Sequence, residues 1–460
     1  MNQESKSFQA SFESRSLKES KWVGLTGLKG SSRAYLLSRW REKVKGPILV
    51  ITPHLRDAEF LLGDFRFFQR EGSGIACLFP QWETLPYDEI PPHPESIRER
   101  VNCLFTLMRD EGAVIFSSVK ALMQRVLLSS DLKRSTYTLT AGEEVERDRL
   151  VHFLHEGGYA SARVVEERGD FSLRGAIIDI FSSLYEEPLR LEFDGDQLES
   201  IRRFDVESQR SIRGAEMEKA TLLPVRDISR DPSAQTMATL FDYLKKGGWV
   251  FIVEGEEVER EAEAFSHMAE SHYEKVRVKK TSVPLPDSLY LRSEDLLNTL
   301  GRFQTVFLQE GPVVPPRCER IYPLDVESNE DLQREIKSIF QTEERSTEGS
   351  PLSVLLKHLR HWQREGKGVF IVSHTTGQAE RMRDLLSHYE IASRLERGKR
   401  FGEVMEERGV ITLLTGLLSS GFRAFEEGWV LLTEEEIFGE RRKLREEKPG
   451  KRLPKGEGAP

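Results

Sequence analysis

The feature that most constrains the fold of this chain is a regular alternation of short apolar runs and amphipathic stretches near its beginning. The apolar runs are PILVIT at residues 47–52, GIACLF at 74–79 and AVIFSS at 113–118. The stretches with helical spacing of apolar residues cover residues 34–45, 56–70, 97–109 and 119–127. Apolar runs without polar interruption are typical of strands buried on both faces, with helices covering those faces. We therefore predict an α/β domain with a parallel sheet.

A different pattern begins after Tyr159, where apolar residues alternate with polar ones or lie in β-rich runs. The segments are FSLRGAIIDIF, PLRLEF and QLESIRRFD. The sequence DGD at residues 194–196 is a hairpin turn signal between the last two segments. With a helix expected over about residues 143–156, the pattern predicts a small antiparallel α+β domain inserted into the first domain.

The α/β pattern returns near Ala220. We expect SAQTMATLFDYLKKGG, at residues 233–248, to form a helix closed by glycine and followed by the strand WVFIVEG. A helix over residues 256–275 and the strand TVFLQ come next. Residues 311–349 are rich in Pro, Glu, Ser and Thr, which predicts a linker with one helix near residues 330–340. The later runs GVFIVS, GVITLLTG and WVLLTEEEIFG predict a third α/β unit.

The 460 residues are therefore expected to form several domains. The predicted fold is α/β and multidomain: a degenerate P-loop-type parallel domain, an inserted small antiparallel α+β domain, and a second small α/β domain. The expected boundaries are 18–135 and 215–310 for the two halves of the first domain, 136–214 for the insert, 311–349 for the linker, 350–442 for the separate small domain and 443–460 for a disordered tail. The tail is charged and rich in Gly and Pro, so it cannot bury a core.

Composition argues against several classes of protein. The chain is 38% hydrophobic and 31% charged with a net charge of −9, which is typical of a soluble globular protein and not of a nucleic-acid coat. The sequence shows neither an apolar signal segment nor a membrane-spanning run, so we expect a cytoplasmic protein with no membrane partner. Cys77, Cys103 and Cys318 are odd in number and far apart, which favours buried thiols over a zinc site or a disulfide framework.

The stretch WVGLTGLKGSSRAYLL looks like the start of a phosphate-binding loop. A working loop reads G-x-x-x-x-G-K-[ST], in which the lysine reaches the phosphates and the hydroxyl holds Mg²⁺. Counted from Gly24, Lys29 replaces the second glycine and Gly30 replaces the lysine, while Ser31 keeps the hydroxyl. We expect Gly24, Gly27 and Gly30 to form only a tight strand-to-helix turn, with no cofactor. Weak anion binding at the helix N-terminus and ATP hydrolysis at an unusual loop are the alternatives.

Histidines offer the other candidate sites. His152 and His155, like His358 and His361, have the i, i+3 spacing of one helix face and could hold a metal. Because no acidic residue stands at a fixed supporting offset, we interpret them as surface residues and predict no metal site. His93 lies in a proline-rich loop without a paired nucleophile, so we predict no catalytic residue and no enzyme.

Several longer segments resemble one bacterial protein family. They are GLTG in the loop, LPYDEIPPHPESIRERV at residues 85–101, GDFSLRGAIIDIF…PLRLEFDGDQLESIRRFDVESQRS at 169–211, VIFSSVKALMQRVL and LLSSGFRAFEEGWVLLTEEEIFGER. Through them the chain resembles, from about residue 18 to residue 442, the N-terminal part of the bacterial transcription-repair coupling factors, the Mfd family. The pattern in the insert is the most specific of these.

The resemblance implies a UvrB-like region that has lost its ATP site and whose inserted domain binds UvrA, the excision-repair subunit that UvrB also binds. Family members continue with domains that bind RNA polymerase and drive translocation on DNA, which we expect to be absent from this chain. The resemblance therefore implies a non-catalytic adaptor that recruits UvrA to stalled-transcription damage sites in nucleotide excision repair. An ATP-independent DNA-binding UvrB-like scaffold is the alternative.

The charged residues of the insert favour a protein interface over a nucleic-acid one. Residues 161–213 contain no lysine and twelve acidic residues, which give this segment a net charge of −4. The arginines of the segment are Arg163, Arg168, Arg174, Arg190, Arg202, Arg203, Arg210 and Arg213. A phosphate-backbone binder would be basic and rich in lysine, whereas arginine forms bidentate bonds with carboxylates in protein interfaces. The alternative is that these arginines pair with neighbours on their own sheet.

The resemblance also implies particular contact residues. Arg174 in GDFSLRG and Arg190 in PLRLEF match arginines that contact UvrA in the family. Phe193 and the next position form an aromatic pair in the family, but here the second residue is Asp194. Asp194 either pairs with a basic residue of the partner or only starts the turn.

Overall fold

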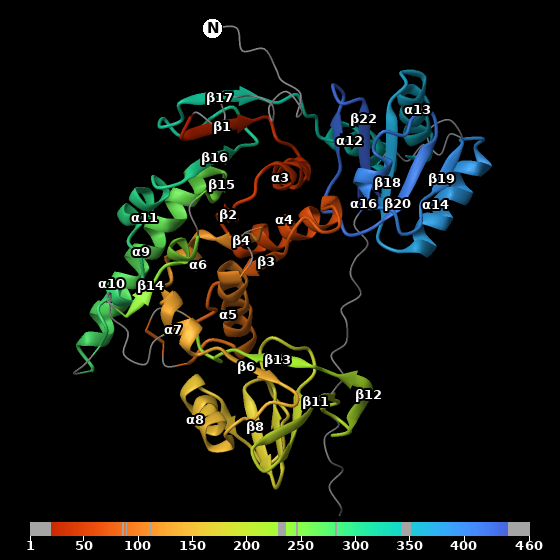
Figure 1. Ribbon diagram of the computed structural model, residues 1–460. Coiled ribbons are helices and arrows are strands. Elements are labelled where there is room, and N and C mark those ends of the chain that lie inside the picture. Colours follow the sequence, from red (N-terminus) through yellow and green to blue (C-terminus); the bar gives the residue numbers. More distant parts are fainter. Residues whose placement is uncertain are drawn as a thin grey trace, which may run out of the picture.

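The computed structural model describes residues 20–84, 87–88, 90–109, 112–228, 236–244, 247–280, 283–341 and 351–439. Three large sheets contain most of the strands among these residues (Figure 1). The predicted α/β class is confirmed, because the largest sheet is parallel and helices cover it. The tail expected at residues 443–460 lies outside the described residues.

The first sheet contains β1 (Trp22–Thr26), β2 (Ile48–Thr52), β3 (Ala76–Phe79), β4 (Val114–Ser118), β15 (Trp249–Val253), β16 (Gln304–Leu308) and β17 (Arg320–Pro323). All neighbouring strands are parallel, in the order β17-β1-β16-β15-β2-β4-β3. Strands β2, β3 and β4 lie within the three apolar runs at the start of the chain, so the prediction of a parallel sheet from these runs is confirmed.

Hydrophobic cores cover both faces of this sheet, because successive side chains of a strand point to opposite faces. In β2, Val50 belongs to one core, whereas Leu49 and Ile51 belong to the other. The first core contains α3 (Ser32–Lys43) and α4 (Leu55–Phe68). The second core contains α5 (Pro94–Arg109), α6 (Val119–Met123), α7 (Ser129–Arg134), α9 (Gly255–Arg277), α10 (Pro286–Leu289) and α11 (Ser293–Leu300).

The helix predicted over residues 233–248 is wrong. The described part of this segment forms a short strand, β14 (Met237–Ala238), which pairs with β5 (Val126–Leu127), and then a 3₁₀ helix, η1 (Leu240–Tyr243). Thr239 caps this helix, donating from its hydroxyl to the Asp242 carboxylate 2.7 Å away. Strand pairing with a distant segment and a tight cap thus override the local helical pattern.

The insert is built on a second sheet of six strands. They are β7 (Ala160–Ser161), β8 (Asp170–Arg174), β9 (Ile177–Ile180), β10 (Leu189–Asp194), β11 (Gln197–Phe204) and β12 (Ser211–Glu216). Only the β7–β8 pair is parallel, so the predicted antiparallel character is confirmed for the other pairs. One helix, α8 (Arg147–Gly157), packs on this sheet, and it begins four residues later than the expected start at residue 143.

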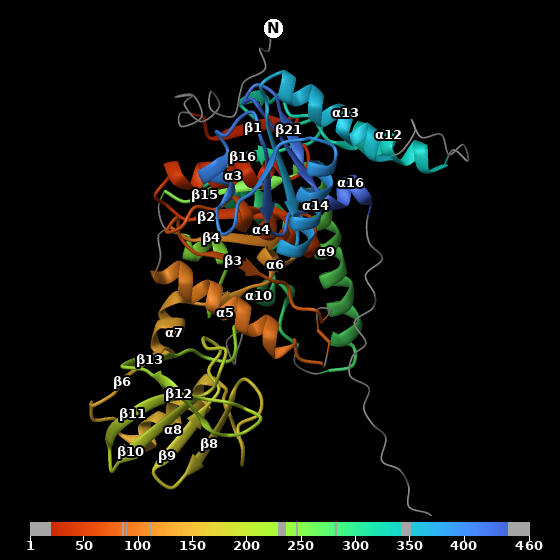
Figure 2. The same cartoon turned by 90° about the vertical axis from the view of Figure 1, so that its right-hand side faces the viewer.

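The chain enters and leaves the insert at one place. Strand β6 (Tyr137–Thr140) on the way in pairs with β13 (Lys219–Leu222) on the way out, through four antiparallel residue pairs. We refer to β6 and β13 as the neck. Figure 2 shows the insert projecting from the lower end of the molecule, with the first and third sheets above it.

A fully buried arginine fixes the chain just beyond the neck. The Arg100 side chain, on α5, forms an ion pair with Asp227, which is also buried. Its Nη1 donates to the Pro80 carbonyl at 2.9 Å and to Gln124 Oε1 at 3.0 Å. The Trp82 ring lies 4.9 Å from the guanidinium carbon, and its Nε1 donates to Asp227 at 3.1 Å. Four segments of the first domain therefore meet at one charged pair.

The third sheet follows in the last part of the chain. Its strands are β18 (Gly368–Ser373), β19 (Ser393–Leu395), β20 (Ile411–Thr415), β21 (Phe422–Ala424) and β22 (Trp429–Thr433), in the order β19-β20-β18-β22-β21. Its helices are α12 (Glu330–Gln341), α13 (Pro351–Arg364), α14 (Thr376–His388), α15 (Phe401–Val404) and α16 (Glu434–Phe438). Strands β18, β20 and β22 form where the three apolar runs predicted them.

The first and third sheets share one hydrophobic core. Tyr35 of α3 lies edge-on to Trp429 of β22 with ring centroids 5.3 Å apart, and Phe68 of α4 lies 5.3 Å from Phe401 of α15. All four rings are buried. The last unit, expected to be separate, thus has its own sheet but packs directly on the first (Figure 1).

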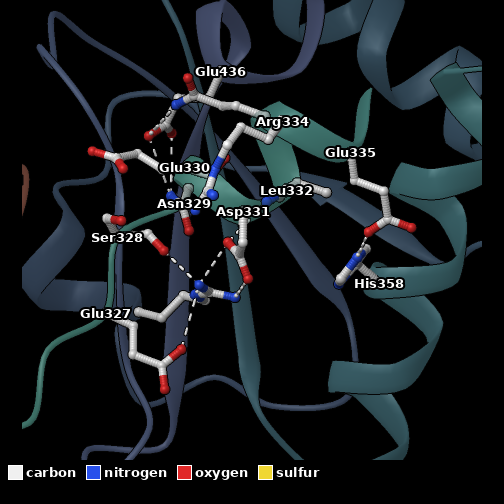
Figure 3. Close-up of polar contacts among 12 residues, drawn as sticks. Glu327, Ser328, Asn329, Glu330, Asp331, Leu332, Arg334, Glu335, His358 and Glu436 are labelled. Carbon is white, nitrogen blue, oxygen red and sulfur yellow. Dashed lines mark hydrogen bonds and ion pairs between the residues drawn. The ribbon is translucent and has the colours of Figure 1, made fainter. Parts of the chain in front are cut away.

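The interpretation of residues 311–349 as a linker is wrong for residues 320–341. Strand β17 extends the first sheet at its edge, and α12 confirms the helix expected near residues 330–340. The nearly buried Arg423 of β21 pairs with Glu327, which precedes α12, at 3.3 Å and with Asp331, in the first turn of α12, at 2.7 Å (Figure 3). Asn329 donates to the Leu431 carbonyl at 2.9 Å. Residues 327–331 are therefore held to the third sheet by two ion pairs and a buried hydrogen bond.

Candidate functional site

The two faces of the insert sheet differ in chemistry. One face carries Phe171, Ile178 and Leu191, which form a core with Leu150 and Leu154 of α8. On the other face, the strand register aligns polar side chains in one row across four strands, β8 to β11. The row consists of Ser172, Asp179, Arg190 and Arg202. We refer to this side as the polar face.

A buried carboxylate lies at the centre of the polar face. Asp179 has no exposed side-chain surface. Arg190 donates to both of its oxygens, from Nε to Oδ1 at 2.8 Å and from Nη2 to Oδ2 at 2.9 Å. Arg174, at the end of β8, forms an ion pair with the same carboxylate. Bidentate, charge-assisted bonds of this kind fix the planes of both groups. We refer to Arg174, Asp179 and Arg190 as the Asp179 clamp.

The turn between β11 and β12 folds back onto the clamp. Gln209 has a φ of 56°, an uncommon left-handed conformation for a residue other than glycine. Its carbonyl accepts a bond from Arg190 Nη1 at 3.2 Å. Its side-chain amide donates to the carbonyls of Val165 and Val206, at 3.1 and 2.8 Å. Gln209 thus joins the turn at residues 205–210, the loop before β8 and the clamp.

The four predicted contact residues differ in how much of each side chain is exposed to solvent. Arg174 is 42% exposed, whereas Arg190 is 13% exposed. Phe193 points into the core, with only 4% of its surface exposed, so its predicted role as an apolar contact does not fit this structure. Asp194 is exposed at the end of β10 and opens the turn to β11, in which Gly195 has a φ of 61°. The structure therefore supports the interpretation that Asp194 starts the turn between β10 and β11.

Internal pairing, the alternative reading of the insert arginines, applies to five of the eight. Besides the clamp, Arg168 pairs with Glu186 at 2.9 Å and Arg203 with Glu187 at 3.1 Å. Arg202 is 3.6 Å from Glu192. No described residue accepts a bond from the side chains of Arg163, Arg210 or Arg213. Most of the arginine charge in the insert is therefore balanced by acidic residues of the insert itself.

The glycine-rich loop turns from β1 into α3 as expected. Gly27 and Gly30 have φ values of 81° and 53°, which favour glycine. A Cβ atom on Gly30 would lie 2.3 Å from the Gly421 carbonyl oxygen of the last unit. Lys29 Nζ pairs with Glu310 at 2.9 Å. Gly24 packs against Val314, and Ser31 is buried without a bond from its hydroxyl to the backbone of α3.

A cavity of about 660 Å³ lies beside this loop, at the carboxyl ends of β2 and β15. Its charged lining comprises Lys29, Arg33, Asp57, Asp64, Glu254, Glu257 and Glu310. Arg33 pairs with Glu254 and lies 3.8 Å from Glu310, so both cations of the lining already have carboxylate partners. Acidic residues outnumber these cations, which makes the cavity unfavourable for a polyphosphate.

One wall of this cavity joins the first and last units through a buried acid. Asp64 of α4 accepts bonds from the backbone N–H of Ser419 at 2.6 Å and from its hydroxyl at 2.5 Å. Burial raises the pKa of the Asp64 carboxyl from 3.8 to about 6, and the two bonds from Ser419 oppose this shift. The charged form of Asp64 is therefore costly at neutral pH.

Replacing Asp64 with asparagine should flatten the pH dependence of stability between about pH 4 and pH 6. In this window the folded state binds more protons than the unfolded state, so the free energy of unfolding falls as pH rises. The contribution reaches at most about 3 kcal/mol, because one pKa unit corresponds to about 1.4 kcal/mol. Asparagine keeps one acceptor and one donor for Ser419.

Urea denaturation of the wild type and Asp64→Asn at several pH values measures this contribution. Ser419→Ala removes a hydroxyl that lowers the pKa of Asp64, so it should extend the window above pH 6. Equal pH slopes for the wild type and Asp64→Asn would contradict the role of Asp64.

The histidine candidates are distributed over the surface. His358 Nε2 lies 2.9 Å from Glu335, and His361 Nε2 lies 3.3 Å from Glu365. His152 and His155 are exposed on α8. The His93 ring accepts a bond from the Glu95 N–H at 3.2 Å. Across the part of the chain that the structure describes, no group of three His, Cys, Asp or Glu side chains is arranged to hold a metal ion.

The three cysteines form no disulfide. Cys103 is buried, and Cys77 and Cys318 are partly buried. Burial raises the pKa of the Cys103 thiol.

None of the described helices combines the length and apolar character that a membrane crossing requires.

Comparison with known proteins bears on the insert and on the whole chain. Residues 137–227, which span the neck and the insert, match the UvrB interaction domain family. The transcription-repair-coupling factor of Myxococcus xanthus is 26% identical over 92% of this chain and 39% of its own length. The Escherichia coli K12 factor is 27% identical over 90% of this chain and 38% of its own length. Over most of its length, the chain is similar to the transcription-repair-coupling factors.

Another relative has a higher sequence identity over a shorter aligned region. The transcription-repair-coupling factor of Mycobacterium bovis is 35% identical over 36% of this chain and 14% of its own length. The chain spans about two fifths of the length of the Myxococcus and Escherichia factors. The likeness to the coupling factors inferred from the sequence motifs is therefore confirmed.

Proposed function

We propose that this chain is an adaptor region that recruits UvrA in transcription-coupled nucleotide excision repair, using the inserted domain as its docking surface. The match of residues 137–227 to the UvrB interaction domain and the likeness to transcription-repair-coupling factors support this proposal. RNA polymerase and DNA would be partners of the longer coupling factors. Because the cations beside the glycine-rich loop are paired with carboxylates, we propose no nucleotide chemistry for this chain.

The observation that carries the proposal is that Arg174 is both exposed to solvent and held in place by an ion pair. The resemblance assigns a contact role to this residue, and its guanidinium is 42% exposed at the end of β8. Its ion pair with the buried Asp179 holds it in place. An arginine ordered before binding loses less entropy when it forms bonds with a partner. The β8–β9 hairpin also exposes Leu173 beside it.

Replacing Arg174 with alanine should weaken binding to purified UvrA by roughly 10- to 100-fold, the range for loss of an interface arginine. Isothermal titration calorimetry would give the dissociation constant. Arg383→Ala is a matched control, because Arg383 of α14 is 45% exposed and pairs with Asp384 at 3.1 Å, outside the insert.

The control variant should bind UvrA as tightly as the wild type. Equal affinities for Arg174→Ala and Arg383→Ala would contradict docking through the clamp. Absence of wild-type binding would contradict UvrA recruitment by this chain. Substitution of Arg190 by glutamate is a poor probe, because it would place a second carboxylate against the buried Asp179.

A further inference from the structure

The two arginines of the Asp179 clamp differ in how many of their donors are in use. Arg190 uses Nε and Nη2 on Asp179 and Nη1 on the Gln209 carbonyl. Its guanidinium carbon lies 4.6 Å from the centre of the buried Phe204 ring, which covers one side of the group. All three nitrogen atoms of Arg190 therefore have partners inside the insert.

Arg174 is bound at one nitrogen only. Its Nη2 pairs with Asp179 and lies 3.5 Å from Gln209 Oε1. No described residue accepts a bond from its Nε or Nη1. The free donors belong to a half-exposed side chain at the end of a strand, where a second molecule can reach them. A carboxylate fits such an open guanidinium edge, because two parallel N–H···O bonds match its two oxygens.

We propose that a carboxylate of the docking partner engages Arg174, and that Arg190 is a positioning residue that does not contact the partner. This inference rests on the proposed function of the insert. Arg190 acts by orienting Asp179, which in turn fixes Arg174, and by holding the turn at residues 205–210 through the Gln209 carbonyl. The two arginines that the family resemblance treats alike thus have different roles.

A double-mutant cycle between Arg174→Ala and Arg190→Lys tests this division of roles. Lysine keeps the charge beside Asp179 but cannot reproduce the three-nitrogen bonding of Arg190. Arg190→Lys alone should weaken binding to purified UvrA by roughly three- to tenfold and speed hydrogen exchange in residues 205–210. In the Arg174→Ala background, Arg190→Lys should cause no further loss of affinity, because its effect passes through Arg174.

Each other outcome overturns the proposal. Equal losses from Arg190→Lys in both backgrounds would mean that Arg190 contacts the partner or only supports the fold. Full affinity for Arg190→Lys would remove its positioning role, and full affinity for Arg174→Ala would remove the contact. Gln209→Ala keeps the carbonyl that accepts from Arg190 but removes the side-chain bonds of the turn, so it provides a second variant for the same cycle. If wild-type UvrA binding is absent, the proposed function fails, while hydrogen exchange in Arg190→Lys still reports whether Arg190 holds the turn.

Discussion

Replacing Arg100 with alanine is expected to lower the free energy of unfolding of the first domain by about 3–5 kcal/mol, the cost of leaving a buried charge without its partner. The substitution leaves Asp227 buried, with a bond from Trp82 but no cation. It also leaves the Pro80 carbonyl and the Gln124 amide oxygen without the donor that they share. Urea denaturation followed by tryptophan fluorescence measures the effect, since the Trp82 ring lies against the guanidinium.

Two further variants separate charge burial from a general effect of losing an arginine. Arg134→Ala removes an exposed residue that pairs with Asp131 on the surface of α7, so it should cost less than about 1 kcal/mol. The double variant Arg100→Met/Asp227→Asn should cost less than Arg100→Met alone, because no unpaired charge remains buried. A loss below about 1 kcal/mol for Arg100→Ala would contradict the structural role of this pair.

Replacing Asp179 with alanine should destabilise the insert by about 2–4 kcal/mol and abolish measurable binding to UvrA. Without this carboxylate, two guanidinium groups lie close together on the polar face, and Arg190 is largely buried. Repulsion between them should release Arg174 and the turn at residues 205–210. Hydrogen exchange of residues 170–216 reports the loss of protection, and calorimetry reports the loss of affinity.

Asp194→Ala is the matched control for stability, because Asp194 is exposed at the end of β10, four residues beyond Arg190, and is not part of the clamp. Its cost should stay within a few tenths of a kcal/mol, the usual range for surface positions. Unchanged exchange rates in the Asp179→Ala insert would contradict the central place of this carboxylate. Loss of affinity without any change in exchange would instead indicate that Asp179 acts on the partner directly.

The parallel sheet of the first domain could be predicted because its signal is local. Runs such as PILVIT and AVIFSS have apolar residues at successive positions, and both faces of the strand need them. The helix predicted over residues 233–248 failed for the opposite reason. The pairing of Met237 with Leu127 depends on a segment 110 residues away, which no short window of sequence contains.

The sequence predicted that arginines characterise the candidate site, but not which acidic residue they pair with. The excess of arginine over lysine in the insert is visible in the sequence, and Arg174 is exposed as a contact residue must be. Asp179, the residue that organises the clamp, was missed, although its position in IIDI is an acidic interruption of an apolar strand. The resemblance named Phe193 as a contact residue, but Phe193 lies on the same face of β10 as Leu191 and is buried in the core of the insert.

The neck between β6 and β13 has a mechanical consequence. Because the polypeptide crosses to the insert and back through adjacent antiparallel strands, a pull by a bound partner reaches the rest of the molecule through this neck and through the bond from Asn102 of α5 to the Ser183 carbonyl at 3.1 Å. Beyond the neck the force meets the Arg100–Asp227 pair and the bond from the Leu127 N–H to the Asp227 carbonyl at 2.9 Å. Tension would therefore load the interior of the large sheet domain before it reached the last unit, whose attachment lies on the far side of that sheet.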